Sequence, residues 1–136
     1  MGRFAGRQQL LLVDDEENTN EELAERLEGE GFRCYKAFSA DSALEQITLH
    51  PGIALVITSL RMPEESGISL IEQLREHTAR HHLPVIATTA HADMDDVSDL
   101  LRLQVLDLLR KPIQYERLLD TLDTLFPDPK RYELQR

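Results

Sequence analysis

The stretch IALVITSLRMP, residues 53–63, places an uninterrupted apolar run ahead of a polar loop. A short apolar run without polar alternation is typical of a parallel strand that is covered on both faces. Similar runs stand at residues 10–13 (LLLV) and 84–87 (PVIA), and a run interrupted by one aspartate covers residues 105–109. The segment FRCYKA, which begins at Phe32, mixes charged and apolar residues and so predicts an edge strand. The sequence therefore predicts a sheet built from five short strands.

The segments between these strands carry apolar residues at a period near 3.6, which predicts amphipathic helices. The apolar positions are Leu23, Ala24 and Leu27; Ala43, Leu44 and Ile47; Leu70, Ile71 and Leu74; Met94, Val97, Leu100 and Leu101; and Leu118, Leu119, Leu122 and Leu125. Ser39 and Asp93 are suited to cap helix N-termini, while Gly29, Pro51 and Pro127 mark helix ends. Because strand and helix alternate and crossovers are right-handed, the predicted fold is a three-layer α/β sandwich with a parallel sheet.

The length and composition of the chain suit one domain. It has 136 residues, of which 41% are hydrophobic, and we expect the domain to occupy residues 1–126. Residues 127–136 are polar and contain prolines, which predicts a tail or the start of a linker to an output domain. The net charge of −10 disfavours binding to nucleic acid or an acidic membrane, so we expect protein partners. A lone cysteine, Cys34, and an N-terminal apolar run too short for a signal peptide or membrane span predict a cytoplasmic location.

Polar side chains gather where the predicted strands end. In an open α/β sheet, ligands bind at the carboxyl ends of the strands, near the point where strand order reverses. The residues that follow the strands are Asp14, Asp15 and Glu16; Thr58 and Ser59; Thr89; and Lys111. Adjacent carboxylates suit Mg²⁺, and a nearby hydroxyl and ammonium suit the oxygens of a phosphoryl group. The sequence therefore predicts one rim on which carboxylates, hydroxyls and an amine converge.

Several short motifs follow one another in a fixed order. They are VDDE at residues 13–16, LRMP at residues 60–63, Ser66-Gly67, Thr89-Ala90-His91 and Lys111-Pro112. In this order and spacing, each after its expected strand, they resemble the receiver domains of bacterial response regulators over roughly residues 9–126. The resemblance implies the flavodoxin-like, CheY-like (βα)5 sandwich, with a five-stranded parallel sheet in the order 2-1-3-4-5.

The resemblance also implies a role for each matching position. Asp14 and Asp15 correspond to the acidic pair that holds Mg²⁺, and the backbone carbonyl of Arg61 corresponds to a further ligand. Thr89 corresponds to the switch hydroxyl. Lys111 corresponds to the amine that contacts the phosphoryl group, and a cis peptide is expected between it and the following proline.

Two positions depart from the family pattern. Ser59 occupies the slot of the phospho-accepting aspartate, and a serine hydroxyl without an adjacent base is a much weaker nucleophile. Leu108 occupies the slot of the aromatic residue that moves inward when the switch hydroxyl engages a phosphoryl group. Both the input and the relay of the switch are therefore altered, and one carboxylate fewer weakens any Mg²⁺ site.

These departures favour an atypical receiver that acts by protein–protein interaction, is not phosphorylated at the usual position and is not an enzyme. The first alternative is an ordinary Mg²⁺-dependent, aspartyl-phosphorylated receiver whose acceptor has been replaced by an engineered Ser59. The second is a Mg²⁺-dependent phosphohydrolase with Asp14 as nucleophile. Crowding of Asp14, Asp15 and Glu16 disfavours the second, because such enzymes need a spaced acid partner.

The stretch from Asp93 to Phe126 forms the face that receivers commonly use for dimers or for docking an output domain. Its charges of both signs suit self-complementary pairing in a homodimer, and they are Arg102, Asp107, Arg110, Arg117, Asp120 and Asp123. The other expected partners are an output domain, a cognate kinase or another regulator.

Some of the same residues also have purely structural interpretations. Asp14 and Asp15 would serve as a solvated acidic turn before a helix, and a Lys111–Asp15 ion pair would account for the lysine without phosphoryl chemistry. The histidines at 81–82 and His91 lack the spacing of a metal site, which favours surface positions.

Overall fold

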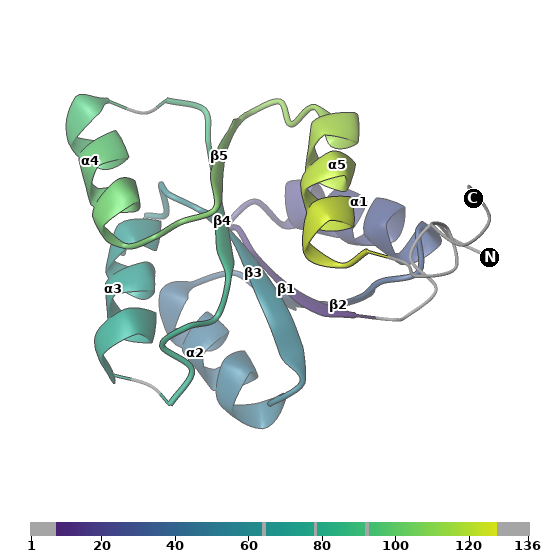
Figure 1. The fold of residues 1–136 in the computed structure, drawn as a ribbon, viewed down its shortest axis with the longest axis horizontal. Helices are drawn as coiled ribbons and strands as arrows, with labels where there is room; N and C mark the ends of the chain where they lie inside the picture. The colour runs from purple at the N-terminus through teal and green to yellow at the C-terminus, as the bar shows by residue number, and fades with distance from the viewer. Residues whose placement is uncertain (1–7, 64, 78, 92, 128–136) are drawn as a thin grey trace.

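The computed structural model describes residues 8–63, 65–77, 79–91 and 93–127, which form one parallel sheet flanked by helices (Figure 1). The strands are β1 (Gln9–Val13), β2 (Arg33–Ala37), β3 (Ile53–Ser59), β4 (Val85–Thr89) and β5 (Asp107–Arg110). The helices are α1 (Glu17–Gly29), α2 (Ala40–Leu49), α3 (Gly67–His77), α4 (Met94–Arg102) and α5 (Tyr115–Leu125). Within these ranges, no helix is both long and apolar enough to cross a membrane.

The strand order is β2-β1-β3-β4-β5, and each neighbouring pair is parallel, which confirms the predicted sheet. The mixed segment from Phe32 forms the edge strand β2, as predicted. β5 begins at Asp107, two residues later than the apolar run at 105–109. The delay arises because Gln104 has a φ of 59° and the N–H of Val105 still donates to the carbonyl of Leu100 in α4.

Two apolar clusters fill the space on the two faces of the sheet. Figure 1 shows α1 and α5 over one face and α2, α3 and α4 over the other. Along β1, Leu10 and Leu12 pack under α1 and α5, whereas Leu11 and Val13 pack under the other helices. Alternate residues of a strand point to opposite faces, so a strand buried on both sides must be apolar throughout. The continuous runs identified in the sequence therefore report burial of both faces.

The apolar stripe predicted for helix α4 is divided between core and surface, with Leu100 buried and the other three residues exposed. Met94 and Leu101 are 78% and 75% exposed, and Val97 is also exposed. The buried positions are Asp96 and Leu100, one helical turn apart. Asp96 faces inward because its carboxylate has hydrogen-bonding partners there, and this rotates the rest of the apolar stripe outward.

The predicted helix caps are confirmed. The side chain of Ser39 accepts a hydrogen bond from the N–H of Ser42, and Asp93 caps α4. α1 ends at Gly29, two residues before Gly31, whose φ of 106° is the left-handed conformation that glycine adopts readily. Of the predicted tail, residues 128–136 lie outside the described residues.

Candidate functional site

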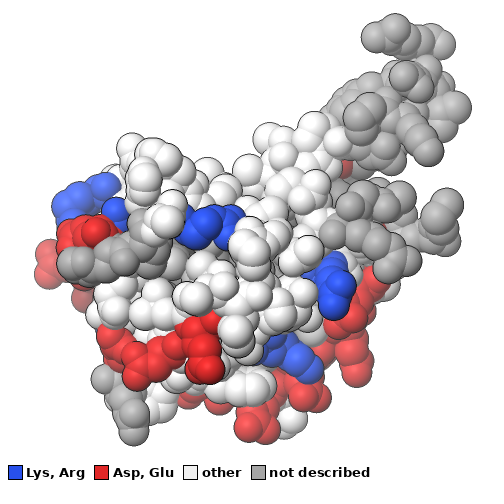
Figure 2. Space-filling model, turned by 90° about the horizontal axis from the view of Figure 1, so that it is seen from below, with Lys and Arg blue, Asp and Glu red and all other residues white. Residues whose placement is uncertain are grey.

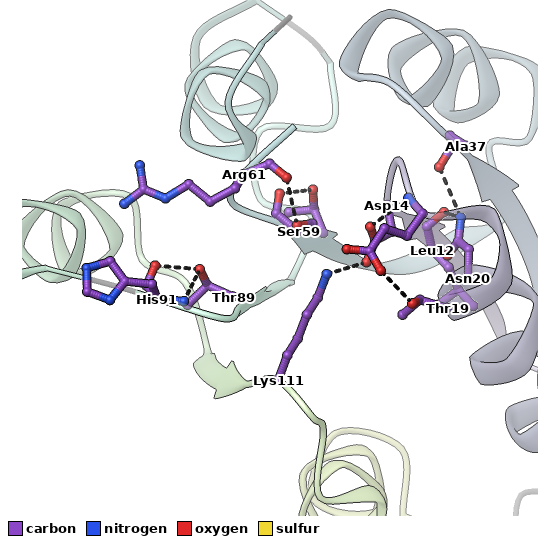
Figure 3. Close-up of polar contacts among 12 residues, drawn as sticks. Leu12, Asp14, Thr19, Asn20, Ala37, Ser59, Arg61, Thr89, His91 and Lys111 are labelled. Carbon is purple, nitrogen blue, oxygen red and sulfur yellow. Dashed lines mark hydrogen bonds and ion pairs between the residues drawn. The ribbon is translucent and has the colours of Figure 1, made fainter. Parts of the chain in front are cut away.

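The ends of β1, β3 and β4 and the turn after β5 bring the predicted site residues to one rim. Figure 3 shows Asp14, Ser59, Thr89 and Lys111 around a common space at the carboxyl ends of the strands. Asp14, Ser59 and Thr89 are buried, because each ends or directly follows a central strand. The peptide bond between Lys111 and the following proline is cis, as expected.

Asp14 and Lys111 form an ion pair inside this rim. The Nζ of Lys111 lies 2.7 Å from Oδ2 of Asp14, and the two side chains are 18% and 7% exposed. The other carboxylate oxygen, Oδ1, accepts a hydrogen bond from the N–H of Glu16 at 3.1 Å. The predicted partner of Lys111 was the neighbouring residue Asp15, and that choice is wrong.

The Ser59 hydroxyl is turned toward its own loop. Its Oγ donates to the backbone carbonyl of Arg61 at 3.2 Å, the carbonyl assigned from the family pattern as a metal ligand. The loop is held close by Gly67, whose N–H donates to the carbonyl of Leu60 at 2.9 Å. A Cβ at residue 67 would lie 2.1 Å from the carbonyl oxygen of Ser59, so only glycine fits there. This contact explains why the Ser66-Gly67 motif follows the LRMP segment.

The side chain of Arg61 reaches away from the rim to helix α4, a contact that sequence reasoning missed. Its Nη2 lies 2.5 Å from Oδ2 of Asp96, which is at the third position of that helix. Asp96 and Asp93 form a reciprocal capping box, each accepting the backbone N–H of the other. The hydrogen bond from the N–H of Asp96, aided by the charge of Arg61, lowers the pKa of Asp93 below its ordinary value.

The two positions that the resemblance assigns to the switch, Thr89 and Leu108, make contacts close to their own strands. The hydroxyl of Thr89 donates to the carbonyl of His91 at 2.7 Å and accepts from the N–H of the same residue at 3.2 Å. Leu108 is half-buried and packs against the apolar cluster under α2, α3 and α4. The hydroxyl that would contact a phosphoryl group is therefore occupied by its own loop.

Asn20 is a second residue that the sequence analysis did not single out. Its amide Nδ2 is buried and donates to the carbonyls of Leu12 and Ala37 at 3.2 and 3.1 Å, joining the ends of β1 and β2 beneath α1. The sequence carried a signal for this contact. Asn20 lies one helical turn before Leu23 and Ala24, which define the inward face of the helix, so its amide is expected to point toward the ends of the strands.

A hollow of about 580 Å³ adjoins the rim between α1 and the turn that leads into α5. Lys111 lines it together with Arg26 and the ring of Tyr115, and the guanidinium of Arg26 lies 3.8 Å from the centre of that ring. Burial is the main cause that raises the pKa of Tyr115 to about 12. Of the Asp14–Lys111 pair, the lysine is the member that lines this hollow.

The model for the response regulator receiver domain matches residues 10–123 of this sequence. The chain belongs to the response-regulator receiver family. It is 33% identical over 117 residues to the two-component response regulator PprB of Pseudomonas aeruginosa, a match that covers 85% of this chain and 42% of PprB. It is also 33% identical over 110 residues to the regulatory protein AtoC of Escherichia coli, covering 80% of this chain and 23% of AtoC.

Solved structures agree with this assignment. A response regulator receiver protein from Pseudomonas putida matches with a TM-score of 0.83 and 32% identity, over 87% of this chain and 97% of that one. The chain spans less than half the length of PprB and AtoC, so the likeness concerns their receiver part. Receiver domains are signalling modules, and they generally bind Mg²⁺ at their acidic pocket.

The residues that would hold Mg²⁺ here are those predicted from the sequence, Asp14, Asp15 and the carbonyl of Arg61, whose oxygens are hard donors of the kind that this ion takes. Two of the three groups already have intramolecular donors, namely the ammonium of Lys111 and the hydroxyl of Ser59. Among the described residues, no three His, Cys, Asp or Glu side chains are grouped to hold a metal. The pocket therefore fits Mg²⁺ by ligand type, in competition with Lys111 and Ser59.

The histidines that were predicted to lie at the surface are exposed. His81 and His82 are exposed, and the centres of their rings lie 4.1 Å apart with the ring planes inclined by 55°. His91 is exposed in the loop after β4. Their positions agree with the surface interpretation.

Proposed function

We propose that this receiver domain signals without phosphorylation of the usual acceptor, by contacts with partner proteins. The observation that carries the proposal is the hydroxyl of Ser59 in the acceptor slot, bonded to a backbone carbonyl instead of a base. A hydroxyl needs a general base or a depressed pKa to attack phosphorus, and the carbonyl of Arg61 accepts a hydrogen bond without removing the proton. Transfer from phosphohistidine to Ser59 is therefore not expected.

The groups that would hold a phosphoryl group support the same proposal. Lys111 already neutralises Asp14, and the Thr89 hydroxyl is bonded to the loop at His91. Moving either group to a phosphoryl oxygen would break a contact that exists without it. Mg²⁺ binding remains part of the proposal in attenuated form, held by Asp14, Asp15 and the Arg61 carbonyl, where it would neutralise negative charge. In this role the domain is not an enzyme.

The surface proposed for partner contact is the face formed by α4, β5 and α5. Several charges expected to pair between copies are paired within the chain: Arg117 lies 2.8 Å from Asp107, and Arg102 lies 3.4 Å from Asp99. What this face offers instead is apolar area, because Met94, Val97, Leu101 and Leu106 are exposed together on α4 and its following loop. We propose that a second copy or a partner protein covers this apolar area.

Charge supports protein partners over nucleic acid or membrane. On the face shown in Figure 2, Asp and Glu cover more of the described surface than Lys and Arg, in keeping with the net charge of −10. Such a field repels phosphate groups. We further propose a cytoplasmic location and the division into a domain at residues 1–126 and a tail or linker at 127–136.

The acceptor slot is tested with a small phosphoryl donor. Acetyl phosphate with Mg²⁺ should leave the parent protein and Ser59→Ala unmodified in intact-mass spectrometry, whereas Ser59→Asp should gain one phosphoryl group. The alanine variant is the matched control, because it removes the hydroxyl without adding a carboxylate. A stoichiometric phosphoryl adduct on the parent would contradict the proposal.

The partner surface is tested by charge insertion. Leu101→Glu on α4 should abolish self-association or partner binding measured by sedimentation velocity. Leu49→Glu is the matched control, because Leu49 is 61% exposed on α2, outside the proposed face. Equal sedimentation and partner binding of the parent and both variants would remove this face from the proposal.

A further inference from the structure

Arg61 lies between the acceptor slot and helix α4 and contacts both. Its backbone carbonyl accepts the hydroxyl of Ser59 at 3.2 Å, and its guanidinium lies 2.5 Å from the carboxylate of Asp96. Figure 3 shows the backbone of Arg61 beside Ser59 and its side chain directed away from the pocket. One residue thus joins the slot that departs from the family pattern to the helix on the proposed partner surface.

Arg61 contacts α4 at Asp96, a residue of the capping box that begins the helix. Oδ2 of Asp96 accepts both the guanidinium of Arg61 and the N–H of Asp93, so the ion pair and the capping box share one oxygen. The side chain of Asp96 is only 11% exposed, whereas that of Arg61 is 57% exposed, so the carboxylate is shielded from water and the guanidinium remains open to it. The first turn of α4 is therefore held to the loop after β3 by a charge-assisted hydrogen bond.

Few other groups hold α4 in place. It has nine residues, and a helix of that length is marginal without tertiary contacts. Its exposed apolar residues contribute no packing against the core, which leaves Leu100, with Leu103 just after the helix, as its buried apolar contacts. Among the described residues, the ion pair holds the first turn of α4, and Leu100, Leu103 and the hydrogen bond from Arg75 to the Leu103 carbonyl, 2.9 Å long, hold its other end. Loss of the ion pair is therefore expected to loosen the first turn.

The usual route from a receiver pocket to this face is interrupted here. The Thr89 hydroxyl is bonded to its own loop at His91, and Leu108 has no ring to move inward. The path through Ser59, Arg61 and Asp96 consists instead of two hydrogen bonds that lead from the slot to the helix, 3.2 and 2.5 Å long.

We infer that Arg61 is a positioning residue that couples the acceptor slot to α4, so that the contacts made at residue 59 set how firmly α4 and its apolar stripe are held. The choice of α4 as the output surface rests on the proposed function. The coupling itself is a property of the Ser59–Arg61–Asp96 path and is measured without any partner or phosphoryl donor.

The experiment is amide hydrogen exchange of α4, resolved by NMR, in the parent, Arg61→Gln, Asp96→Asn and the double variant. Either single variant should exchange about tenfold faster in α4, and the double variant should exchange no faster than the faster single one. Arg61→Lys, which keeps the charge but not the planar fork, should give an intermediate rate. Amides of β1 and β3 should keep the parent rate, which reports that each variant is folded.

Two further variants distinguish coupling from simple anchoring. Ser59→Ala removes the bond to the Arg61 carbonyl and should speed exchange in α4 about threefold in the parent but not in the Arg61→Gln background. Arg102→Gln is the matched control, because the contacts that Arg102 makes with other described residues are exposed, at 3.4 Å to Asp99 and 3.6 Å to Glu72. It should leave the N-terminal turn of α4 unchanged.

The coupling is overturned if Arg61→Gln leaves α4 at the parent rate, or if Ser59→Ala has the same effect in both backgrounds. Phosphorylation of the parent by acetyl phosphate would instead overturn the proposed function and would leave these exchange rates as they are. The exchange experiment therefore tests the coupling, and the acetyl phosphate experiment tests the proposed function, each independently of the other.

Discussion

The Asp14–Lys111 pair can be broken by a change that preserves the shape of the lysine. Lys111→Met keeps the length of the side chain and removes the ammonium that lies 2.7 Å from Oδ2 of Asp14. Asp14 then retains only the N–H of Glu16, at 3.1 Å, as a hydrogen-bond donor given by the structure. The variant is therefore expected to be less stable than the parent, because a buried carboxylate has lost its counter-charge.

The size of the loss follows from the separation and the burial. At an effective dielectric constant of about 20, two unit charges this close attract by roughly 6 kcal/mol before the cost of removing them from water. Breaking a fully buried pair costs about 3–5 kcal/mol. Because Lys111 keeps 18% exposure and Asp14 keeps one backbone donor, we expect about 2–4 kcal/mol here, or roughly 10 °C in melting temperature for a domain of this size.

The assay is urea unfolding of the parent, Lys111→Met, Asp14→Asn and the double variant. The double-mutant cycle should give a coupling free energy of about 2 kcal/mol or more. Lys36→Met is the matched control: its pair with Glu21 is 3.6 Å long with 37% and 61% exposure, so it should cost about 0.5 kcal/mol or less. Mg²⁺ should stabilise Lys111→Met more than the parent, because the ion no longer competes with an ammonium. A loss at Lys111 no larger than that at Lys36, with no coupling, would refute this reasoning.

Three further predictions rest on single contacts. Gly67→Ala should cost about 1–3 kcal/mol in urea unfolding, since its Cβ would meet the carbonyl of Ser59 at 2.1 Å, whereas Gly29→Ala, with nothing within 4 Å, should be neutral or slightly stabilising. Burial raises the pKa of the Cys34 thiol to about 12, so iodoacetamide at mildly alkaline pH should alkylate it slowly in the folded domain and quickly in urea. The pKa of Asp93 is lowered in the folded domain, so its carboxylate should contribute to stability above pH 3.8, and this contribution should be lost as the pH falls through the lowered pKa of the folded state. An NMR carboxyl titration of Asp93 with a midpoint at or above 3.8 would contradict this.

The sheet could be predicted from sequence because burial on both faces leaves a plain signal. β1, β3 and β4 contain uninterrupted apolar runs at residues 10–13, 53–57 and 85–87, and the helices between them follow a period of 3.6. The direction of the α4 stripe could not be predicted, because the spacing of Met94, Val97 and Leu101 identifies a common face without identifying what covers it. The inward position of Asp96 depends on Arg61, which is 35 residues away in sequence.

The rim could be predicted because carboxyl ends of parallel strands meet at one edge. The partner of Lys111 follows if the two-residue alternation of the strands is continued past their ends. Leu12 and Leu109 both face α1 and α5, and Asp14 and Lys111 each lie two residues further along the same strands, so they point to the same side. Asp15 lies at the opposite alternation, which explains why it does not take the ion pair.

The fold tolerates a change at position 59 more readily than a change at Asp14 or Lys111. Replacing an acceptor carboxylate by Ser59 removes a charge that would repel Asp14 and Asp15, and the hydroxyl finds an acceptor at the Arg61 carbonyl. Asp14 and Lys111 are different, because losing either one alone leaves the other as a buried, uncompensated charge.

The retained pair is therefore explained by folding stability, whether or not the domain ever holds a phosphoryl group. Asp14 and Lys111 would be kept in a receiver that has lost its acceptor, since a single substitution at either position costs a few kcal/mol of a marginal total. Their presence does not argue for phosphoryl chemistry. We propose that the function of this domain depends instead on Ser59 and Arg61, where the acceptor slot is joined by hydrogen bonds to the helix that bears the exposed apolar surface.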